Sequence, residues 1–331
     1  MKLIDRFNRT HDYLRISLTD KCNYKCIYCN PNLLSEKLEK MDLLSFEELL
    51  RVIEIFAGEL NFKKFRFTGG EPLIRKDVFN FFNEVNDLKS KYKFTTGITT
   101  NGSLLKGRVK ELKQSGVDSL NISLDSMNKS KFISITQKDE ADRILSVIDE
   151  AIEIGYSPVK INSVIIKGIN DNEILNFVDY FKNMDVNLRF IEFMPFGSNE
   201  WERNGLISYK EMKNIVDEKY SLSLLISDKN SVAKDYQMND HLAKISFISS
   251  ITDHFCSTCN RVRISSTGKF RLCLFSEGKH EINFKELFRK NYSNKDIINE
   301  LHEAIQHKWE KHPEPEELSQ MMFNNMMSIG G

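Results

Sequence analysis

Short apolar runs alternate with amphipathic stretches over the first two-thirds of the chain. Apolar or β-branched runs predict strands at residues 13–18, 64–67, 94–98, 119–124, 159–166 and 188–193. Between them, apolar positions recur with helical spacing at residues 45–60, 106–115, 141–154 and 173–184. Strands that alternate with helices are typical of parallel βαβ units. The pattern predicts an α/β protein with about six such units, closed or nearly closed into a barrel.

The alternation of predicted strands and helices ends at about residue 200. Residues 201–250 are polar and irregular, and two helical stretches follow at residues 284–290 and 293–308. We therefore expect two parts. Residues 1–200 would form the partial barrel, and residues 201–331 would form a smaller C-terminal α+β region that covers its open side.

Unusual residues follow the predicted strands. In chain order they are Cys22, Cys26 and Cys29, then Gly69-Gly70-Glu71-Pro72, then Thr99-Thr100-Asn101-Gly102, then Ser123 and Asp125, and finally Met194-Pro195. In parallel α/β architectures the carboxyl ends of the strands lie on one edge, and ligands bind there. The sequence therefore predicts that these loops converge on one site.

Composition narrows the class of protein. The chain has 331 residues, 40% of them apolar, and its 47 basic residues balance 47 acidic ones. That balance argues against a nucleic-acid-binding protein, although a local cationic pocket is compatible with it. We find no run of about 18 apolar residues and no signal-peptide pattern. We therefore expect a cytoplasmic protein without a membrane partner, in which disulfides are disfavoured.

All six cysteines fall into two triplets. The first is Cys22, Cys26 and Cys29, and the second is Cys256, Cys259 and Cys273. Disulfides fit poorly, because each group holds an odd number of cysteines. Structural zinc would need a fourth ligand in each group, such as His11 or His254. A four-iron cluster on three cysteines leaves one iron open to bind something else, and we favour this interpretation.

The first triplet carries a family resemblance. The spacing Cys22-x3-Cys26-x2-Cys29, with Tyr28 inside it and Gly69-Gly70-Glu71-Pro72 after the next strand, resembles the radical S-adenosylmethionine (SAM) superfamily. The resemblance implies a partial (βα)6 TIM-like barrel with a [4Fe-4S] cluster. SAM chelates the open iron of that cluster, and its one-electron cleavage yields a 5′-deoxyadenosyl radical.

The second half of the chain narrows the resemblance. His254-Phe255-Cys256-x2-Cys259-Asn260-Arg261-Val262-Arg263, then Cys273-Leu274 and a terminal Gly330-Gly331, are similar to the GTP 3′,8-cyclase family, also called the molybdenum cofactor biosynthesis protein A family. The likeness covers essentially the whole chain. It implies a lyase that catalyses the first step of molybdenum cofactor (molybdopterin) biosynthesis.

The resemblance also implies a reaction and its partners. A second [4Fe-4S] cluster would bind the guanine base of GTP, and the radical would take hydrogen from ribose C3′. Attack on guanine C8 would give (8S)-3′,8-cyclo-7,8-dihydroguanosine 5′-triphosphate. The implied partners are an electron donor such as a flavodoxin and a downstream cyclic pyranopterin monophosphate synthase. The oligomeric state is left open between a monomer and a homodimer.

The resemblance also assigns site residues to individual positions of this sequence. The resemblance places SAM contacts on Tyr28, Gly70, Ser123 and Met194, GTP contacts on Arg15, Arg66, Thr99, Lys160, Arg261, Val262 and Arg263, and a functional tail on Gly330 and Gly331. Each has a simpler interpretation. A lone basic residue is usually a solvated surface charge, and a Gly-Gly pair usually forms an ordinary turn. The end of a chain is usually frayed. GTP carries about three to four negative charges, so a cluster of cations beside the motif loops favours the functional interpretation.

Some positions depart from the family pattern. Asn30 stands where Met is common, Gln137 stands where a Gly is expected, and Ala233 to Asp240 looks degenerate. Two other classes remain open. One is a radical SAM enzyme of another kind with an auxiliary cluster, such as a peptide-maturing enzyme, and the other is a zinc-stabilised interaction protein.

Overall fold

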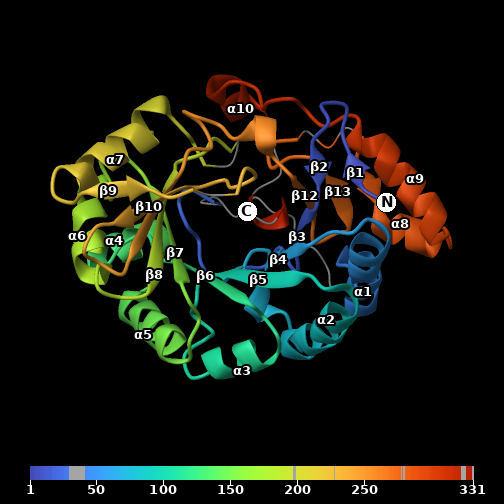
Figure 1. Ribbon diagram of the computed structural model, residues 1–331, viewed down its shortest axis with the longest axis horizontal. Coiled ribbons are helices and arrows are strands. Elements are labelled where there is room, and N and C mark those ends of the chain that lie inside the picture. The colour runs from blue at the N-terminus through green and yellow to red at the C-terminus, as the bar shows by residue number, and fades with distance from the viewer. Residues whose placement is uncertain are drawn as a thin grey trace.

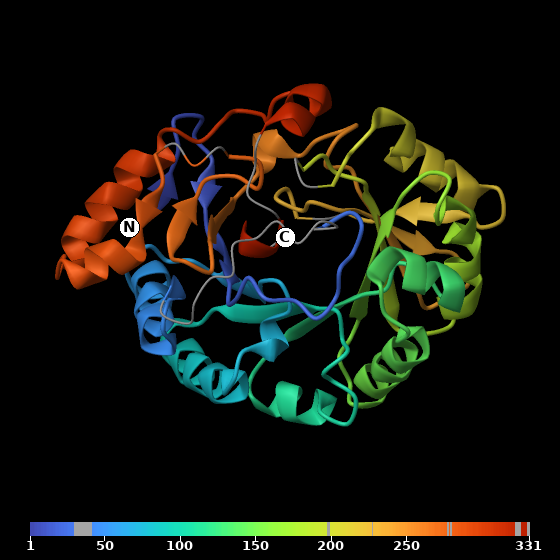
Figure 2. The same ribbon diagram turned by 180° about the vertical axis from the view of Figure 1, so that it is seen from behind.

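A long curved sheet with helices on its outer side forms the framework of the protein. The computed structural model describes residues 1–29, 42–196, 199–226, 228–276, 278, 280–321 and 326–329. Seen down the shortest axis, the strands surround a central space and the helices lie around the outside (Figure 1). The view from behind shows the same arrangement (Figure 2).

The elements have the following bounds. The strands are β1 (Leu3–Ile4), β2 (Thr10–His11), β3 (Tyr13–Ser17), β4 (Lys64–Thr68), β5 (Thr95–Thr100), β6 (Ser119–Ser123), β7 (Val159–Ile165), β8 (Val186–Glu192), β9 (Leu222–Leu224), β10 (Lys234–Met238), β11 (Lys244–Ile248), β12 (Arg261–Ile264), β13 (Lys269–Arg271) and β14 (Ile282–Asn283). The helices are α1 (Phe46–Glu54), α2 (Val78–Tyr92), α3 (Val109–Gln114), α4 (Lys129–Thr136), α5 (Ala141–Glu153), α6 (Ile174–Phe181), α7 (Tyr209–Asp217), α8 (Phe284–Arg289), α9 (Asn294–Ile305), α10 (Pro315–Gln320) and α11 (Met326–Ile329).

The predicted strands form the middle of the sheet. Its order is β14-β13-β12-β3-β4-β5-β6-β7-β8-β11-β10-β9, and β1 pairs with β2 in a separate hairpin. From β12 to β11 every neighbouring pair runs parallel. The six strands predicted from periodicity are β3 to β8, so the partial (βα)6 barrel is confirmed. Within the described residues the sheet is open, with β14 and β9 at its edges.

The second half of the chain differs from the expectation. Residues 201–250 are not irregular, because they contain α7 and the strands β9, β10 and β11. The C-terminal region also contributes strands to the barrel sheet itself: β11 extends the sheet from β8, and β12 extends it from β3. β11 alternates too briefly to stand out from its polar neighbours, and register with β8 decides its structure. The stretch from Ala233 to Asp240 contains β10 (Lys234–Met238).

Local sequence explains where the helices begin. Ser45 caps α1 in a capping box, in which Glu48 N donates to Ser45 Oγ and Ser45 N donates to the Glu48 carboxylate. Leu49, Val52 and Ile53 of α1 are buried against the sheet. None of the described helices has the length and apolarity needed to cross a membrane. The short helix α11 lies near the centre of the ring of strands, with Ile329 fully buried (Figure 1).

Candidate active site

Both cysteine triplets line one cavity inside the ring of strands. Its volume is about 960 Å³, at the upper end of the range of about 300–1,000 Å³ typical of ligand pockets. The lining includes Cys22, Cys26, Cys29, Cys256, Cys259 and Cys273. None of these six cysteines forms a disulfide, and all six are partly buried. The predicted convergence of the loops on one site is therefore what the fold produces.

The loop of the first triplet is held by the end of α4. Lys25 N donates to Thr136 O at 3.1 Å, and Ile27 N donates to Ile135 O at 3.0 Å. These carbonyl groups are free to accept because they lie in the last turn of the helix. The next residue, Gln137, adopts a left-handed conformation with φ of 59°, which glycine would adopt without strain. The departure noted at Gln137 therefore falls on a turn that adjoins the cysteine loop.

Tyr28 is fixed by a buried carboxylate. Its hydroxyl donates to Asp125 Oδ2 at 2.7 Å, and Val164 N donates to Asp125 Oδ1 at 2.9 Å. Asp125 is 2% exposed, and burial raises its pKa to about 6, partly opposed by the hydrogen bonds from Val164 and Tyr28. The cysteine loop is thus tied to the ends of β6 and β7 through one side chain.

Gly70 allows the loop after β4 to pack on the cysteine loop. A Cβ atom at this position would lie 2.3 Å from Lys21 O, which is far inside van der Waals contact. Gly70 N and Glu71 N donate to Thr19 O and Lys21 O, each at 2.8 Å. The glycine is therefore required by the chain's own close approach. Gly70 also lines the cavity, where the resemblance implies a SAM contact.

Glu71 connects three of the converging loops. Its buried carboxylate accepts from Thr100 Oγ1 at 2.7 Å, from Asn101 N at 2.7 Å and from Leu73 N at 3.1 Å. Burial raises its pKa to about 7, although these hydrogen bonds lower it. Asn101 Nδ2 donates in turn to Asn23 Oδ1 in the cysteine loop at 2.9 Å. The side chain therefore stabilises the relative positions of the loops.

The thiols of the first triplet fit a positively charged group. Burial and the thiolate of Cys22 raise the pKa of Cys29 to about 12. Burial followed by the charge of Asp125 raises the pKa of Cys26. Thiolate is the form that binds metals, so three thiolates here need a cationic partner such as the iron of a cluster. Within the described part of the chain, no three donors are gathered closely enough for a single metal ion.

The second triplet lies in cationic surroundings. Burial raises the pKa of Cys259, but the charges of Lys308 and Arg261 outweigh burial and bring it to about 6. Burial raises the pKa of Cys256. Cys256 begins a short 3-10 helix, Cys256–Thr258, Cys259 directly follows this helix, and Cys273 follows β13. Three free, partly buried thiols around one cavity also fit an iron–sulfur cluster with an open iron.

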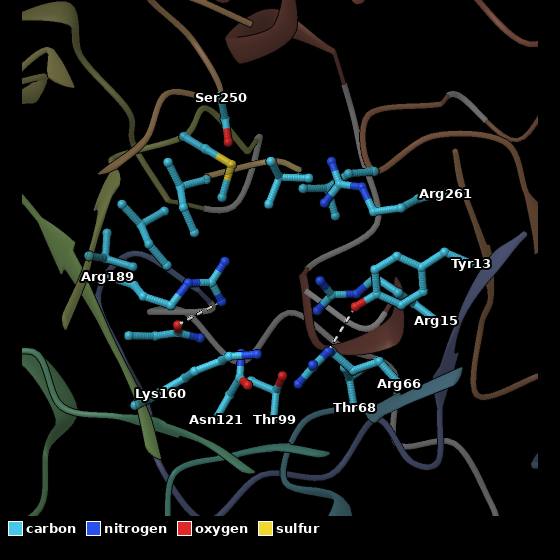
Figure 3. Close-up of a pocket in the computed structure, with 18 of the residues that line it drawn as sticks. Tyr13, Arg15, Arg66, Thr68, Thr99, Asn121, Lys160, Arg189, Ser250 and Arg261 are labelled. Atoms are coloured by element: carbon cyan, nitrogen blue, oxygen red, sulfur yellow. Dashed lines mark hydrogen bonds between the residues drawn. The ribbon is translucent and has the colours of Figure 1, made fainter. Parts of the chain in front are cut away.

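A row of arginines crosses the sheet beside the second triplet. Arg263 on β12 lies in register with Arg15 on β3, which lies in register with Arg66 on β4. Gly97 is the next position in register, and a Cβ there would lie 2.9 Å from the Arg66 guanidinium. Figure 3 shows Arg15, Arg66, Lys160, Arg189 and Arg261 around the same space.

These cations perturb one another. Burial lowers the pKa of Arg15 to about 10, with further lowering by Arg261, Arg66 and Arg189. Burial, then Arg66 and Arg189, lowers the pKa of Lys160 to about 8. Burial raises the pKa of the Tyr13 hydroxyl, but the charges of Arg66 and Arg15 outweigh burial and bring it to about 6. The cavity therefore favours a strongly anionic ligand.

Most of the predicted contact residues meet at this cavity. Its lining includes Tyr28, Gly70, Ser123, Met194, Arg15, Arg66, Thr99, Lys160, Arg261 and Arg263. Val262 is placed differently, because its side chain is fully buried in the core, and strand alternation puts it on the face opposite Arg261. His254 lines the cavity, whereas His11 is buried against Asp5 at 3.1 Å. Gly330, Gly331 and Asn30 lie outside the described residues.

Several lining residues were missed from the sequence. Arg189 on β8 donates to Asn162 Oδ1 on β7 at 3.4 Å, and both line the cavity (Figure 3). Strand alternation could have indicated these residues. Asn162 lies two residues after Lys160 and therefore on the same face of β7, and Arg189 of β8 lies in register with Asn162. Lys308 also lines the cavity. It comes from the segment after α9, and nothing in its local sequence indicates this position.

Two family models match the chain. The model of the Radical SAM superfamily matches residues 16–181, and that of Molybdenum Cofactor Synthesis C matches residues 186–314. Among solved structures, Streptococcus suis SuiB bound to S-adenosylmethionine has a TM-score of 0.65 at 16% identity, over 91% of this chain and 69% of SuiB. At that identity the likeness concerns the fold alone.

Curated relatives match almost the whole chain. GTP 3′,8-cyclase of Thermodesulfovibrio yellowstonii is 38% identical over 99% of this chain and 99% of its own length. Mitochondrial GTP 3′,8-cyclase of Arabidopsis thaliana is 38% identical over 99% of this chain and 83% of its own length. Molybdenum cofactor biosynthesis protein 1 of Dictyostelium discoideum is 40% identical over 99% of this chain, which spans 52% of that relative. The chain therefore belongs to the radical SAM superfamily and, within it, to the GTP 3′,8-cyclase family.

Proposed function

We propose that this chain is a GTP 3′,8-cyclase, which converts GTP to (8S)-3′,8-cyclo-7,8-dihydroguanosine 5′-triphosphate in the first step of molybdenum cofactor biosynthesis. The observation that carries the proposal is one cavity with two cysteine triplets and a row of arginines, Arg263, Arg15 and Arg66. Family membership supports the same reaction, since two relatives that match 99% of this chain carry this name.

The two triplets hold the cofactors in this proposal. Cys22, Cys26 and Cys29 hold the [4Fe-4S] cluster that binds SAM, and Cys256, Cys259 and Cys273 hold the second [4Fe-4S] cluster. When bound, these groups supply a 5′-deoxyadenosyl radical for hydrogen abstraction from ribose C3′ and an open iron for the guanine base. The chain must therefore place C3′ of the ribose within reach of the first site.

The loops of the first triplet orient SAM. Tyr28, Gly70, Ser123 and Met194 contact it in this proposal, and all four line the cavity. The hydrogen bond from Tyr28 to Asp125 keeps the tyrosine ring in one position. The buried carboxylates of Asp125 and Glu71 make this side of the cavity suitable for a ligand with a sulfonium and an ammonium group.

The cations that line the cavity orient GTP. Arg15, Arg66, Arg261 and Arg263 bind the triphosphate and base together with Thr99 and Lys160, and Val262 contributes through its backbone. We add Arg189 to this set, because it lines the same space and lowers the pKa of Lys160. A polyanion relieves the repulsion among these groups, so its binding offsets the cost of burying them.

The C-terminal segment completes the site. Met326 of α11 lines the cavity, and Ile329 is fully buried. This placement supports a role for Gly330 and Gly331 beside the substrate. A segment that fills the centre of the ring also excludes water, which protects a reactive radical from side reactions.

The remaining partners belong to the same proposal. The reaction needs an electron donor such as a flavodoxin, and its product is passed to a cyclic pyranopterin monophosphate synthase. We propose a cytoplasmic location and leave a homodimer open, while the Arabidopsis relative is named mitochondrial.

Anaerobic turnover tests the proposal directly. The chain is reconstituted with iron and sulfide, SAM and dithionite are added, and 5′-deoxyadenosine is measured with GTP, with ATP and without nucleotide. We expect GTP alone to stimulate its formation and to be consumed. Cleavage of SAM without preference for GTP would assign the chain to a radical SAM reaction with another substrate. No cleavage by fully loaded protein would refute the radical chemistry as well.

A further inference from the structure

Two buried cations bind the main chain around the second cysteine triplet. Arg9 is 8% exposed and Lys308 is 3% exposed. Neither belongs to the arginine row, and both donate mainly to main-chain carbonyl oxygens. A buried ammonium or guanidinium group is costly unless its donors are used. Their positions therefore indicate a specific role in this part of the molecule.

Lys308 connects the two arms of the triplet. Its Nζ donates to Arg261 O at 3.0 Å and also to Leu272 O. Arg261 lies two residues after Cys259, and Leu272 directly precedes Cys273. Thirteen residues separate Cys259 from Cys273, and the antiparallel pairing of β12 with β13, in which Arg263 lies opposite Arg271, brings the two arms together. One ammonium group thus joins the backbones that carry these two cysteines.

Arg9 connects the third cysteine to the same segment. Its guanidinium donates to Cys256 O at 2.7 Å, to Glu310 O at 2.9 Å and to Trp309 O at 2.6 Å. Its Nε pairs with Asp5 at 2.6 Å. The main-chain N–H of His312 donates to the sulfur of Cys256. We call residues 308–312 the strap, because this stretch reaches the surroundings of all three cysteines.

We propose that Lys308, acting with the strap and Arg9, is the positioning residue of the second iron–sulfur site: it fixes Cys259 and Cys273 at cluster spacing and supplies a buried positive charge beside the thiolates. The inference rests on the proposed assignment of a cluster to this triplet. The positive charge of Lys308 would also affect the reduction of the cluster. Reduction adds an electron to a cluster that three thiolates already make negative, and a nearby cation stabilises the added charge.

The test uses the full chain in two backgrounds. Wild-type protein and a Cys22→Ala/Cys26→Ala/Cys29→Ala variant, in which the second triplet alone can bind iron, are reconstituted anaerobically. Lys308→Met is placed in both. Lys311→Met is the matched control, because Lys311 lies on the same strap but is exposed and pairs with Glu314 at 3.5 Å. Iron per chain, the rate of iron loss to a chelator and the midpoint potential of the second cluster are measured.

The expected results separate positioning from general stability. Lys308→Met should lose iron at least about tenfold faster than Lys311→Met and should lower the midpoint potential. Lys308→Arg keeps the charge and should restore the potential towards that of the wild type, which a merely structural role would not do. If Lys308→Met does not fold, Lys308→Gln, which keeps amide donors without the charge, carries the same comparison.

Two outcomes would overturn different claims. Equal iron retention and equal midpoint potential in Lys308→Met and Lys311→Met would overturn the role of Lys308. A wild-type chain that binds about four rather than about eight iron atoms, with none in the triple cysteine variant, would overturn the second cluster and with it the proposed function.

Discussion

The two cysteine triplets offer the same ligands in opposite surroundings. The first is a continuous loop, held by main-chain hydrogen bonds to α4 and accompanied by the buried carboxylates of Asp125 and Glu71. The second is split along the chain and is surrounded by Lys308 and arginines. The pKa of Cys29 is raised to about 12, whereas that of Cys259 is lowered to about 6.

This difference can sort two ligands within a single cavity. SAM carries a sulfonium and an ammonium group, so buried carboxylates near its site stabilise it. GTP is a polyanion, and cations at the other site attract it and oppose its binding in the reverse orientation. Iron alone would not distinguish the two sites. The charges around each triplet provide the distinction, and changing them should affect one ligand at a time.

The largest expected effect comes from the two arginines that follow the second triplet on β12. Arg261→Ala or Arg263→Ala should weaken GTP binding by roughly 30-fold or more, because removing one partner of a buried charged contact costs about 2–5 kcal/mol. Cleavage of SAM without substrate should stay largely intact. Equilibrium binding of GTP and formation of 5′-deoxyadenosine without nucleotide measure the two effects. Unchanged GTP affinity in both variants would contradict the assignment of the cationic side.

The second prediction concerns the buried carboxylate of Asp125 beside the first triplet. Asp125→Ala removes the acceptor of Tyr28 and of Val164 N, and hydrogen bonds to a charged group contribute about 1.5–3 kcal/mol. SAM affinity should fall about tenfold, while GTP affinity stays within about twofold. Tyr28→Phe removes one of these bonds and should show a smaller part of the loss. Equal losses for both ligands would show that the two sides do not act separately.

A smaller effect should appear in the pH dependence. Burial, then Arg66 and Arg189, lowers the pKa of Lys160 to about 8, so Lys160 is positively charged below this pH and loses its charge above it. The KM for GTP should therefore rise as the pH increases above about 8, whereas SAM binding should not follow this curve. Lys160→Arg keeps its charge throughout and should flatten the profile. An identical rise in Lys160→Arg would rule out Lys160 as its cause.

The sequence predicted the surroundings of the first triplet better than those of the second. The strands β3 to β8 follow from local periodicity, which also puts Gly70 and Ser123 at the ends of strands, whereas Tyr28 was singled out by the family likeness. The family likeness picked out most of the cations that line the cavity, such as Arg263. Their arrangement in a row depends on register between β12 and β3, which are far apart in the sequence.

The residues that were missed have long-range causes. Arg9 and Lys308 meet the second triplet over sequence separations of 247 and 36 residues, and a lysine within an amphipathic stretch looks like a solvated charge. β11 lies inside a polar region and becomes a strand by pairing with β8. Local patterns therefore predict elements and loop ends, whereas tertiary pairing decides which side chains share a cavity.

The smallest expected effect concerns the turn behind the first triplet. Gln137 holds a left-handed conformation with φ of 59°, and the two preceding residues accept hydrogen bonds from the cysteine loop. Gln137→Gly should raise the free energy of unfolding of the metal-free chain by about 0.5–1 kcal/mol, because glycine adopts this conformation without strain. Gln137→Ala is the control, since it removes the side-chain bond to Ser134 O but keeps Cβ. If both substitutions stabilise the chain, the glutamine side chain causes the destabilisation. If glycine alone stabilises it, the cause is the left-handed backbone conformation of the turn that anchors the first site.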